Sequence, residues 1–499
     1  MTMNMKIIFL IWALLSVPSL SLASEDFLRV VMANDAEQAE QFLNQGANVN
    51  YQSEDGTSIL HWAVYNNNLP LVARLIRAEA RVDTSNDYGS SPMYEASENA
   101  NTEMLRVLLE AGADVESPNL EGQTALMTVA RTGNVEAAGL LLEHGADISR
   151  REQWQLQTPL MWAAAQLQPE MIKFLLTKGA DPDAVSKVRE WERRVTAEPR
   201  PQRRPPGGWT ALAYAARQGC ADCVKVLAEG GADLNLVSPE GISPLLMATL
   251  NGRFDAAAAL IEAGADVNRW DLWGRSPLYS AVDFKTIPIG GRADLPSLDA
   301  TSALDVIDML LAAGANPNVQ LKLFPPYRDL GADRGADSIL GIGATPLIRA
   351  AKAGDVESVE ALLASGALVD LPNNQGMTAL IVASGDGSGL VDTRARYMNE
   401  EFNIEVARRL LAAGADIDAQ RENGGTALHG AAGKGWNEFV KLLVSNNADI
   451  DAENNNAKTA LDVASGKAGG GGFFGRGAPQ IYPETTALLL ELGATESKD

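Results

Sequence analysis

The sequence predicts an all-α protein, an α-solenoid of about twelve stacked helix-turn-helix units. A cassette reading G-x-T-P-L-x-x-A-A recurs along the chain at a spacing of 33 residues, and Gly-Ala-Asp follows 23 positions after the cassette glycine. Well-formed copies begin at Gly122 and Gly241, with their Gly-Ala-Asp segments at Gly145 and Gly264. A fixed period of this length indicates one supersecondary unit stacked on itself, because a single unit cannot bury its own apolar face.

Insertions interrupt the register of the repeat without ending it. Seven of the ten steps between successive cassette positions are 33 or 34 residues long, and the cassette resumes after each longer step. The positions are Gly56, Gly89, Gly122, Leu156, Gly208, Gly241, Gly274, Gly343, Gly376, Gly424 and Ala457. A twelfth unit without the opening turn precedes them, which is typical of a terminal repeat.

Each unit contains signals for the start of one helix and the end of another. Thr158-Pro159 and Thr345-Pro346 are predicted to open helices, because a Thr hydroxyl accepts from first-turn amides and Pro at the first position loses no hydrogen bond. The glycine of Gly-Ala-Asp is predicted to end the second helix in the left-handed conformation.

Three units depart from this pattern. Leu156 and Ala457 replace the cassette glycine, and Glu79 replaces the glycine that ends a helix. Because residues with a Cβ disfavour the left-handed conformation, we expect the fingers of these units to be distorted or looser. Asn447 replaces the same helix-ending glycine in one further unit, and Asn tolerates this conformation better.

The cassette resembles the T-P-L-H-x-A signature of the ankyrin repeat family, seen here as Thr57-Ser-Ile-Leu-His61-Trp-Ala63 and Thr426-Ala-Leu-His429-Gly-Ala431. The resemblance implies helix pairs with protruding β-turn fingers, and a surface that binds proteins without catalysis. We expect a continuous solenoid over residues 24–495, followed by a polar tail at 496–499. Its repeats lie near 24–55, 56–88, 89–121, 122–155, 156–184, 208–240, 241–273, 274–318, 343–375, 376–423, 424–456 and 457–495, with insertions at 185–206, 284–300, 319–342, 385–399 and 466–481.

Residues 1–23 are predicted to be a cleaved signal peptide. Lys6 precedes an apolar stretch from Ile7 to Val17, and Ser21-Leu-Ala23 places small residues at a cleavage site. The alternative is an uncleaved anchor, but the stretch is shorter than the roughly 20 residues that span a bilayer. The chain has no N-x-Ser/Thr glycosylation site, which fits a bacterial exported protein. We therefore expect a periplasmic or secreted protein with no membrane span after cleavage.

The charge of the chain restricts its partners. The full sequence has a formal net charge of −23, and removal of the signal peptide, which holds one Lys and no acid, leaves −24. Such a charge repels phosphate backbones, so nucleic acid is a poor candidate ligand. A basic or neutral protein is the expected partner, and the chain itself is expected to be a monomer.

The residues that most often form catalytic or metal sites are explained by the repeat. His61 and His429 occupy the His position of the signature, where they are expected to connect the turn to its neighbours. Asp recurs once per unit in Gly-Ala-Asp, as at Asp114 and Asp266, and local turn hydrogen bonds explain this better than a calcium array. Gly470–Gly475 matches G-x-G-x-x-G, but no strand precedes it. We therefore predict no catalytic residue, no metal site and no cofactor.

The two cysteines, Cys220 and Cys223, form a C-x-x-C pair at the start of a second helix. A helix N-terminus lowers the pKa of a thiol, so oxidation of the pair is plausible in an exported protein. Redox catalysis is the less favoured reading, because the strand-then-helix context of thioredoxin-like motifs is absent. We expect either a disulfide or two inert thiols.

Large aromatic residues occupy the variable finger and inner-helix positions that bind partners in the ankyrin family. They are Tyr88, Trp154, Trp209 and Trp273 on fingers and Tyr65 on a helix. Such residues are typical interface anchors, although each could instead fold onto a neighbouring finger. Trp62, Trp162 and Tyr214 lie one step further inside and are predicted to belong to the core.

The insertions are the second variable feature. Residues 185–206 have a net charge of +4 and include Arg193, Arg194, Arg203 and Arg204. They are a candidate contact for an acidic partner or for the acidic groove of the protein itself, with a solvated loop as the alternative. Residues 323–327 form an apolar segment that favours a packed loop, and the Gly content and Phe473-Phe474 of the last insertion favour a segment that is either mobile or ordered by a partner.

Together these patterns in the sequence indicate a non-catalytic scaffold or adaptor of the cell envelope or extracellular space. It would bind a partner protein, itself exported or in the envelope, along the concave face of fingers and inner helices. The alternative is a secreted effector or immunity-like inhibitor that blocks an enzyme. An enzyme with its chemistry in the insertions is not supported, since residues 284–342 contain no His.

Overall fold

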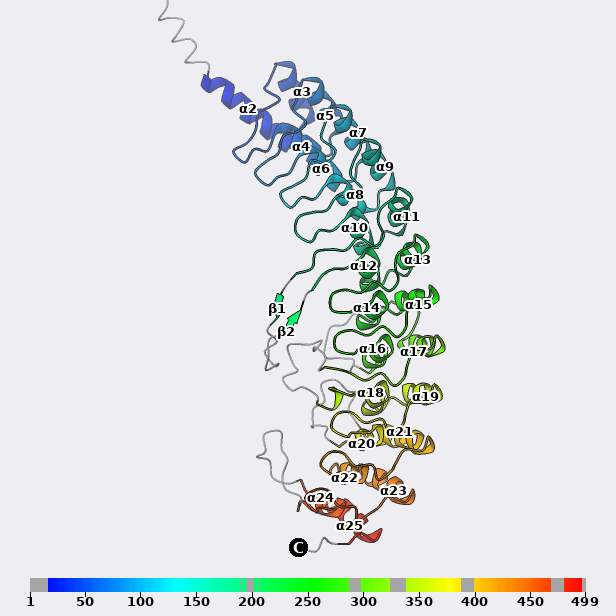
Figure 1. Ribbon diagram of the computed structural model, residues 1–499. Helices are drawn as coiled ribbons and strands as arrows, with labels where there is room; N and C mark the ends of the chain where they lie inside the picture. The colour runs from blue at the N-terminus through cyan, green and yellow to red at the C-terminus, as the bar shows by residue number, and fades with distance from the viewer. Residues whose placement is uncertain are drawn as a thin grey trace, which may run out of the picture. The chain divides into compact units, whose positions relative to one another are not determined.

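Pairs of antiparallel helices follow one another along the chain, as the repeat predicts (Figure 1). The computed structural model describes residues 17–189, 191–193, 202–204, 206–286, 298–323, 338–386, 399–467 and 480–495. Their contacts divide the chain into two compact units. Unit 1 comprises Met1–Val188, Gly207–Ala215 and Val226–Asp233, and unit 2 comprises Arg189–Pro206, Ala216–Lys225 and Leu234–Asp499.

Unit 1 contains two rows of helices. Its helices are α2 (Val17–Met32), α3 (Ala36–Asn44), α4 (Ile59–Tyr65), α5 (Leu69–Arg77), α6 (Pro92–Glu98), α7 (Thr102–Glu110), α8 (Ala125–Thr132), α9 (Val135–Glu143), α10 (Pro159–Ala165) and α11 (Pro169–Thr177). The inner helices α2, α4, α6, α8 and α10 pack on one another in order, and so do the outer helices α3, α5, α7, α9 and α11. Leucines such as Leu60, Leu105 and Leu141 are fully buried between the two rows.

Unit 2 repeats this arrangement after α12 (Ala211–Gln218) and α13 (Ala221–Glu229), which contribute residues to both units. Its inner helices are α14 (Pro244–Leu250), α16 (Pro277–Lys285), α18 (Pro346–Lys352), α20 (Ala379–Ala383), α22 (Ala427–Ala432) and α24 (Ala460–Ala464). Its outer helices are α15 (Phe254–Glu262), α17 (Ala303–Ala312), α19 (Val356–Ala364), α21 (Glu400–Ala412), α23 (Asn437–Ser445) and α25 (Pro483–Glu491). Each row again packs helix to next helix.

The predicted helix starts are confirmed. Helix α10 begins at Pro159, and the Thr158 hydroxyl accepts from the backbone N–H of Met161. Helix α18 begins at Pro346 with Thr345 in the same role. Each cap satisfies one first-turn amide that would otherwise lack a partner inside the helix.

The expected distortion at non-glycine turn positions is wrong. Leu156 and Ala457 have φ values of 54° and 53°, and Glu79 has φ 65°, so all three adopt the left-handed conformation that glycines adopt in other repeats. Asn447 does the same with φ 68°. Packing and hydrogen bonds to neighbouring repeats fix the backbone, so a Cβ at these positions adds strain without changing the turn.

The insertion at residues 185–206 contains the only strands in the described part of the chain, and the sequence did not predict them. Strand β1 (Trp191–Arg193) pairs with β2 (Gln202–Arg204) in an antiparallel ribbon, with Glu192 opposite Arg203 (Figure 1). The ribbon extends from a repeat finger whose two strands already run antiparallel, since Val188 bridges Gly207. These six residues are therefore paired strands and not an irregular loop.

The other insertions enter where the register places them. Three of them lie between the described helices α16 and α17, α20 and α21, and α24 and α25. In the insertion at 319–342, Leu321 is buried with Tyr279 and Ala344, and a 3-10 helix, η1 (Ser338–Leu340), follows. Leu323 is 46% exposed, and residues 324–327 and Phe473-Phe474 lie outside the described residues.

Helix α2 contains the predicted cleavage site. It starts at Val17 and continues past Ala23, and the side chains of Phe27 and Val31 are fully buried. Nothing in the structure tests cleavage, which remains a prediction. Among the helices that the structure describes, none combines the length and apolar character needed to cross a membrane.

Candidate protein-binding surface

Side-chain hydrogen bonds hold the fingers of unit 1 in a fixed turn. The Asn86 side chain accepts from the backbone N–H groups of Tyr88 and Ser90, at 3.1 and 2.9 Å. Asn119 does the same for Glu121 and Gln123 in the next finger, at 3.0 Å each. An Asn that satisfies two turn amides fixes the tip of the finger and directs the side chains between those amides outward.

Neighbouring fingers are also joined to each other. The backbone N–H of Asp87 donates to the carbonyl of Asp55, and that of Gln153 donates to the carbonyl of Glu121, at 2.8 Å in both cases. At Gly89 a Cβ would lie 2.7 Å from the backbone N of Leu120, so only glycine permits this close approach. The finger tips are therefore a rigid surface, whose side chains lose little backbone freedom when they bind.

Four large apolar side chains of unit 1 are exposed on this surface. Tyr88 is 71% exposed, Leu120 69%, Trp154 65% and Tyr65 61%. Tyr65 packs edge-on against Trp62, with ring centroids 5.6 Å apart. The sequence pattern did not indicate Leu120, because its side chain is aliphatic and not aromatic, although it stands two residues before Gly122 as Trp154 stands before Leu156. Neighbouring exposed side chains of this size are typical of binding sites.

Trp209 and Trp273 differ from these residues. Trp209 is half-buried, with its ring 5.4 Å from that of Tyr214 and its backbone N–H bonded to the Ser186 hydroxyl at 3.0 Å. Trp273 is only 2% exposed, so its prediction as an exposed finger anchor is wrong.

The burial of Trp273 has a local cause. Its ring lies under the guanidinium of Arg275, 4.9 Å from the ring centroid, and its carbonyl accepts from the backbone N–H of Lys322 at 2.8 Å. The start of the insertion at 319–342 therefore covers it. Trp270 and Leu272 are exposed in this finger instead, at 53% and 47%.

The core prediction for three other aromatics is also corrected. Trp62, Trp162 and Tyr214 are half-buried, because their position lies along the inner surface of the first helix. Trp162 lies beneath Arg131, 6.0 Å from the ring centroid, and the Tyr214 hydroxyl accepts from the Gln157 amide at 2.8 Å. These rings extend the exposed apolar surface of unit 1 from the fingers onto its inner helices.

The arginines predicted as contacts in the insertion are placed only in part. Arg193 lies on β1, and Arg203 and Arg204 lie on β2. Their side chains are not described, and Arg194 lies outside the described residues.

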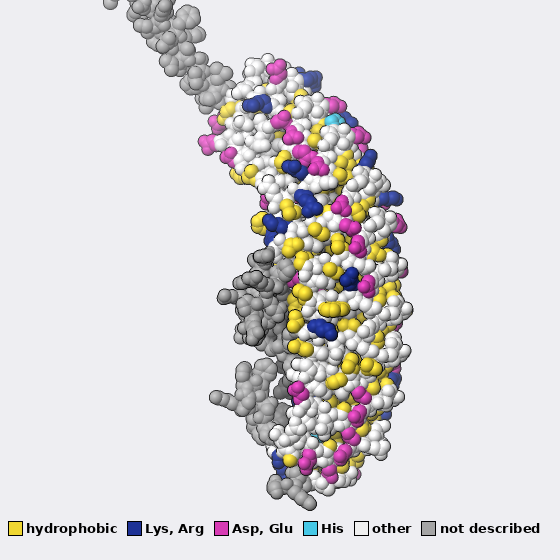
Figure 2. All heavy atoms as spheres, in the orientation of Figure 1, with side chains coloured by type: hydrophobic (Ala, Val, Ile, Leu, Met, Phe, Trp, Pro, Cys, Tyr) yellow, Lys and Arg dark blue, Asp and Glu magenta, His cyan; other side chains and the backbone are white. Residues whose placement is uncertain are grey.

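Acidic side chains surround the exposed apolar ones in unit 1. Glu54, Asp87 and Glu121 are exposed on successive fingers, and Glu98 on α6 bonds to Arg131 of α8 at 2.5 Å. Figure 2 shows acidic side chains beside hydrophobic ones where unit 1 faces the viewer. Hydrogen bonds from the Ser53 hydroxyl and the Thr57 amide hold the pKa of Asp55 below its usual value, so this finger carboxylate stays charged.

The inner helices of unit 2 carry buried charges. Arg349 is fully buried, and its Nε donates to Asp283 at 2.7 Å. Lys285 of α16 is half-buried and bonds to Asp355 at 2.6 Å, and partial burial lowers the pKa of Lys434 in the turn after α22. These groups are engaged within the protein, so the inner face of unit 1 is the better candidate for binding a partner.

The signature histidines link successive repeats. The backbone N–H of Ser58 donates to His61 Nδ1 at 3.1 Å, which leaves the proton on Nε2 to donate to the carbonyl of Ser90 in the next repeat at 2.9 Å. His429 bonds in the same way to Thr426 and to the carbonyl of Lys458. Burial lowers the pKa of both rings, so they are neutral structural groups, as the sequence predicted.

Comparison with protein-family models settles the fold family. A model of ankyrin repeats in three copies matches residues 27–119, 116–186, 195–271 and 396–472, and a second ankyrin repeat model matches residues 347–389. The chain belongs to the ankyrin repeat family. Repeats of this family generally mediate protein–protein interaction, and its members are typically binding scaffolds without enzymatic activity.

Solved ankyrin structures are similar to parts of this chain. The human ASB11 ankyrin repeat domain is 23% identical, with a TM-score of 0.41, and the match covers 48% of this chain and 98% of that one. The ankyrin repeat domain of Bcl-3, a unique member of the IkappaB protein family, is 25% identical, with a TM-score of 0.39 over 52% and 99% of the two chains. Comparison with curated proteins gives no significant match.

The repeated aspartates of the ankyrin array bond within turns and also between repeats. Asp114 accepts from the backbone N–H of Glu116 within its own turn, at 3.0 Å. Its own N–H donates to Asp83 of the preceding repeat at 2.9 Å, and Asp266 donates to Asn235 in the same way at 2.8 Å. The sequence predicted the bonds within each turn but not the bonds between successive repeats, which together form a hydrogen-bond ladder along the array. No group of three or more acidic, His or Cys side chains suited to a metal occurs among the described residues.

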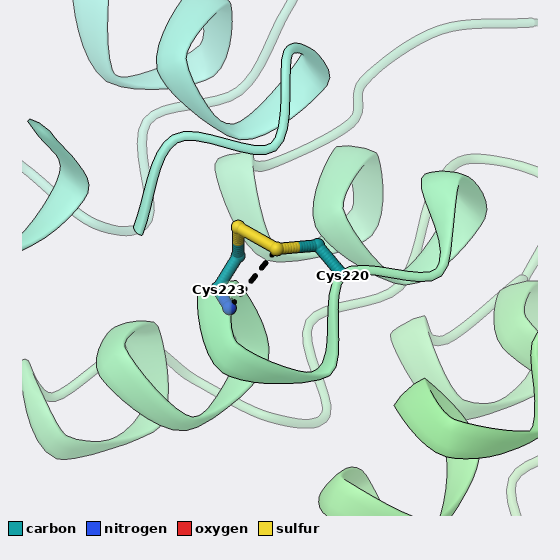
Figure 3. Close-up of a disulfide and its surroundings, with 2 residues drawn as sticks. All are labelled: Cys220 and Cys223. Carbon is teal, nitrogen blue, oxygen red and sulfur yellow. Dashed lines mark hydrogen bonds between the residues drawn. A yellow bond between two sulfur atoms is a disulfide. The ribbon is translucent and has the colours of Figure 1, made fainter. Parts of the chain in front are cut away.

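The two cysteines are joined. A disulfide links Cys220 and Cys223, whose Cα atoms are 5.2 Å apart (Figure 3). Cys220 Sγ accepts from the backbone N–H of Cys223 at 3.1 Å, which is the capping role that Asn101 and Asn134 perform for α7 and α9. Cys223 is fully buried and Cys220 half-buried, so the pair closes the first turn of α13.

One cavity of about 500 Å³ in unit 2 lies among finger residues that include Asn268, Trp270 and Lys322. The Asn268 side chain accepts from the backbone N–H of Asn316 at 2.7 Å and donates to the carbonyl of Gly314 at 3.0 Å. Because hydrogen bonds to the neighbouring repeat already engage both the oxygen and the nitrogen of the Asn268 amide, this side chain is not available to a ligand in the cavity.

Proposed function

We propose that the protein is a non-catalytic scaffold that binds a partner protein through the fingers and inner helices of unit 1. The observation that supports this most directly is the exposure of Tyr88 and Trp154, at 71% and 65%, on fingers whose backbones are hydrogen-bonded to the preceding finger. Rigid aromatic side chains are typical anchors of protein interfaces, because they bury a large area with little loss of conformational entropy.

The proposal includes export. Residues 1–23 have the organisation of a secretory signal, and Phe27 and Val31, the first fully buried side chains from residue 24 onward, follow the predicted cleavage site. Cleavage there leaves Phe27 and Val31 in the mature chain. Expression of the full chain in a secreting bacterial host, followed by N-terminal sequencing, should give a mature protein that begins at Ser24. A protein of full length that fractionates with membranes would contradict this part.

Binding is tested by affinity capture. The mature chain serves as bait for an envelope extract, beside the double variant Tyr88→Ala/Trp154→Ala. Loss of two anchors should weaken capture at least ~30-fold, since removal of one anchor costs about 2 kcal/mol or more.

The matched control is Phe402→Ala/Leu490→Ala. It removes two large side chains that are 56% and 48% exposed on the outer helices α21 and α25. The control should retain the partner. Equal capture by both double variants and the parent would show that the fingers of unit 1 are not the binding surface.

A further inference from the structure

The fingers of unit 1 form an ordered row of acidic and apolar side chains. We define the finger row as Glu54, Asp87, Tyr88, Leu120, Glu121 and Trp154, all of them exposed. Carboxylates occupy the first three fingers of the row, and apolar side chains occupy the second to the fourth. The row therefore changes from acidic to apolar along the stack.

Basic side chains are absent from the first three fingers of the row, whereas the fourth finger, which carries Trp154, has the exposed Arg150 and Arg151. The fingers at residues 51–58, 84–91 and 117–124 contain no Lys or Arg, and the adjacent helices α4 and α6 contain none. Arg131 on α8 is bonded to Glu98 at 2.5 Å, so its charge is compensated. The carboxylates of the first three fingers consequently produce a negative potential that no cation on those three fingers cancels.

The spacing of the row fits an extended chain. Stacked helices are about 10 Å apart, and a polyproline II segment advances about 3.1 Å per residue with three residues per turn, so one finger corresponds to about three residues of a bound peptide. Side chains three positions apart along such a segment lie on the same face, so they would reach equivalent points on successive fingers.

We propose that the finger row binds an extended basic segment of the partner in the polyproline II conformation, with Lys or Arg at every third position over the carboxylates and one apolar side chain against Leu120 and Trp154. This inference rests on the proposed function, whose partner it describes chemically. The aromatic side chains add to recognition of the cations, because the face of Tyr88 or Trp154 attracts an ammonium or guanidinium group.

The test uses synthetic peptides and the purified mature chain. The probe is a fluorescent twelve-residue Gly/Ser peptide with Lys at positions 1, 4 and 7 and Leu at position 10, made also in reversed order. Fluorescence anisotropy should show the better of these binding at least about tenfold more tightly than a Glu-for-Lys peptide. A peptide of the same composition with the three Lys adjacent should bind more weakly than the spaced one.

The matched variants separate the finger row from overall charge. Asp87→Lys/Glu121→Lys should weaken binding about tenfold, whereas Glu110→Lys/Glu143→Lys, on the exposed ends of α7 and α9, changes the net charge equally and should weaken it less than about twofold. Circular dichroism melts confirm that both variants fold.

Three results would overturn the inference: equal binding of the Lys and Glu peptides, equal binding of spaced and adjacent Lys, or equal weakening by the two double variants. None of them affects the proposed function, because capture of a partner through Tyr88 and Trp154 can succeed when its segment is not basic.

Discussion

Replacing Ala457 with glycine should stabilise the last repeat. Ala457 is exposed and has φ 53°, the left-handed conformation that glycine adopts at this position in most repeats. A Cβ in this conformation costs about 1–2 kcal/mol. The additional freedom of glycine in the unfolded chain offsets about 0.4–1 kcal/mol of the relief. Because the Ala457 side chain is exposed and its loss removes no core packing, the net gain should be about 0.5–1 kcal/mol.

Hydrogen exchange followed by mass spectrometry measures this locally, which is necessary because repeat arrays can open one unit at a time. Amides of residues 448–466 in Ala457→Gly should exchange about 2- to 5-fold more slowly than in the parent. The control is Ala452→Gly, which makes the same chemical change at a residue outside the left-handed region. The same amides should exchange faster in Ala452→Gly than in the parent. Acceleration in both variants would refute the assignment of strain to Ala457.

Two further predictions concern the histidines and the disulfide. Burial lowers the folded pKa of His61 and His429, so the unfolded chain binds more protons below its His pKa of about 6.5. The contribution of each ring to the free energy of unfolding should be fully present above that pH and should fall below it by up to about 1.4 kcal/mol per pH unit. Urea titrations from pH 7.5 to 5 should show that the free energy of unfolding depends less steeply on pH in His61→Gln than in the parent. Closing the short loop from Cys220 to Cys223 should contribute about 2 kcal/mol, so a reductant should lower the urea midpoint of the parent and leave Cys220→Ser/Cys223→Ser unchanged.

The local elements of the fold could be predicted because their signals lie within a few residues. Thr158 and Thr345 cap helices that start at the next residue, and Gly145 ends a helix at the expected place. The non-glycine turns were misjudged, because propensity alone favours distortion at Leu156 whereas the neighbouring repeats hold the turn in shape.

The surface was predicted less well than the fold. Tyr65, Tyr88 and Trp154 are exposed, but Trp273, at the same kind of finger position, is covered by residues about 50 positions later in the sequence. Exposure depends on what packs against a residue, and an insertion can change it without changing the repeat. The β1–β2 ribbon was missed for a related reason, since its pairing continues that of the finger beneath it.

The sequence by itself determined that this chain is an array of ankyrin repeats, because each repeat encodes its own helix caps, turns and apolar faces within 33 residues. Only the tertiary structure decided which side chains the array exposes and how its repeats are connected. The bond from His61 to Ser90, the ladder from Asp114 to Asp83 and the cover over Trp273 all join residues that come together only when the repeats stack. Repetition in sequence specifies the unit, whereas contacts between units determine the surface available to a partner.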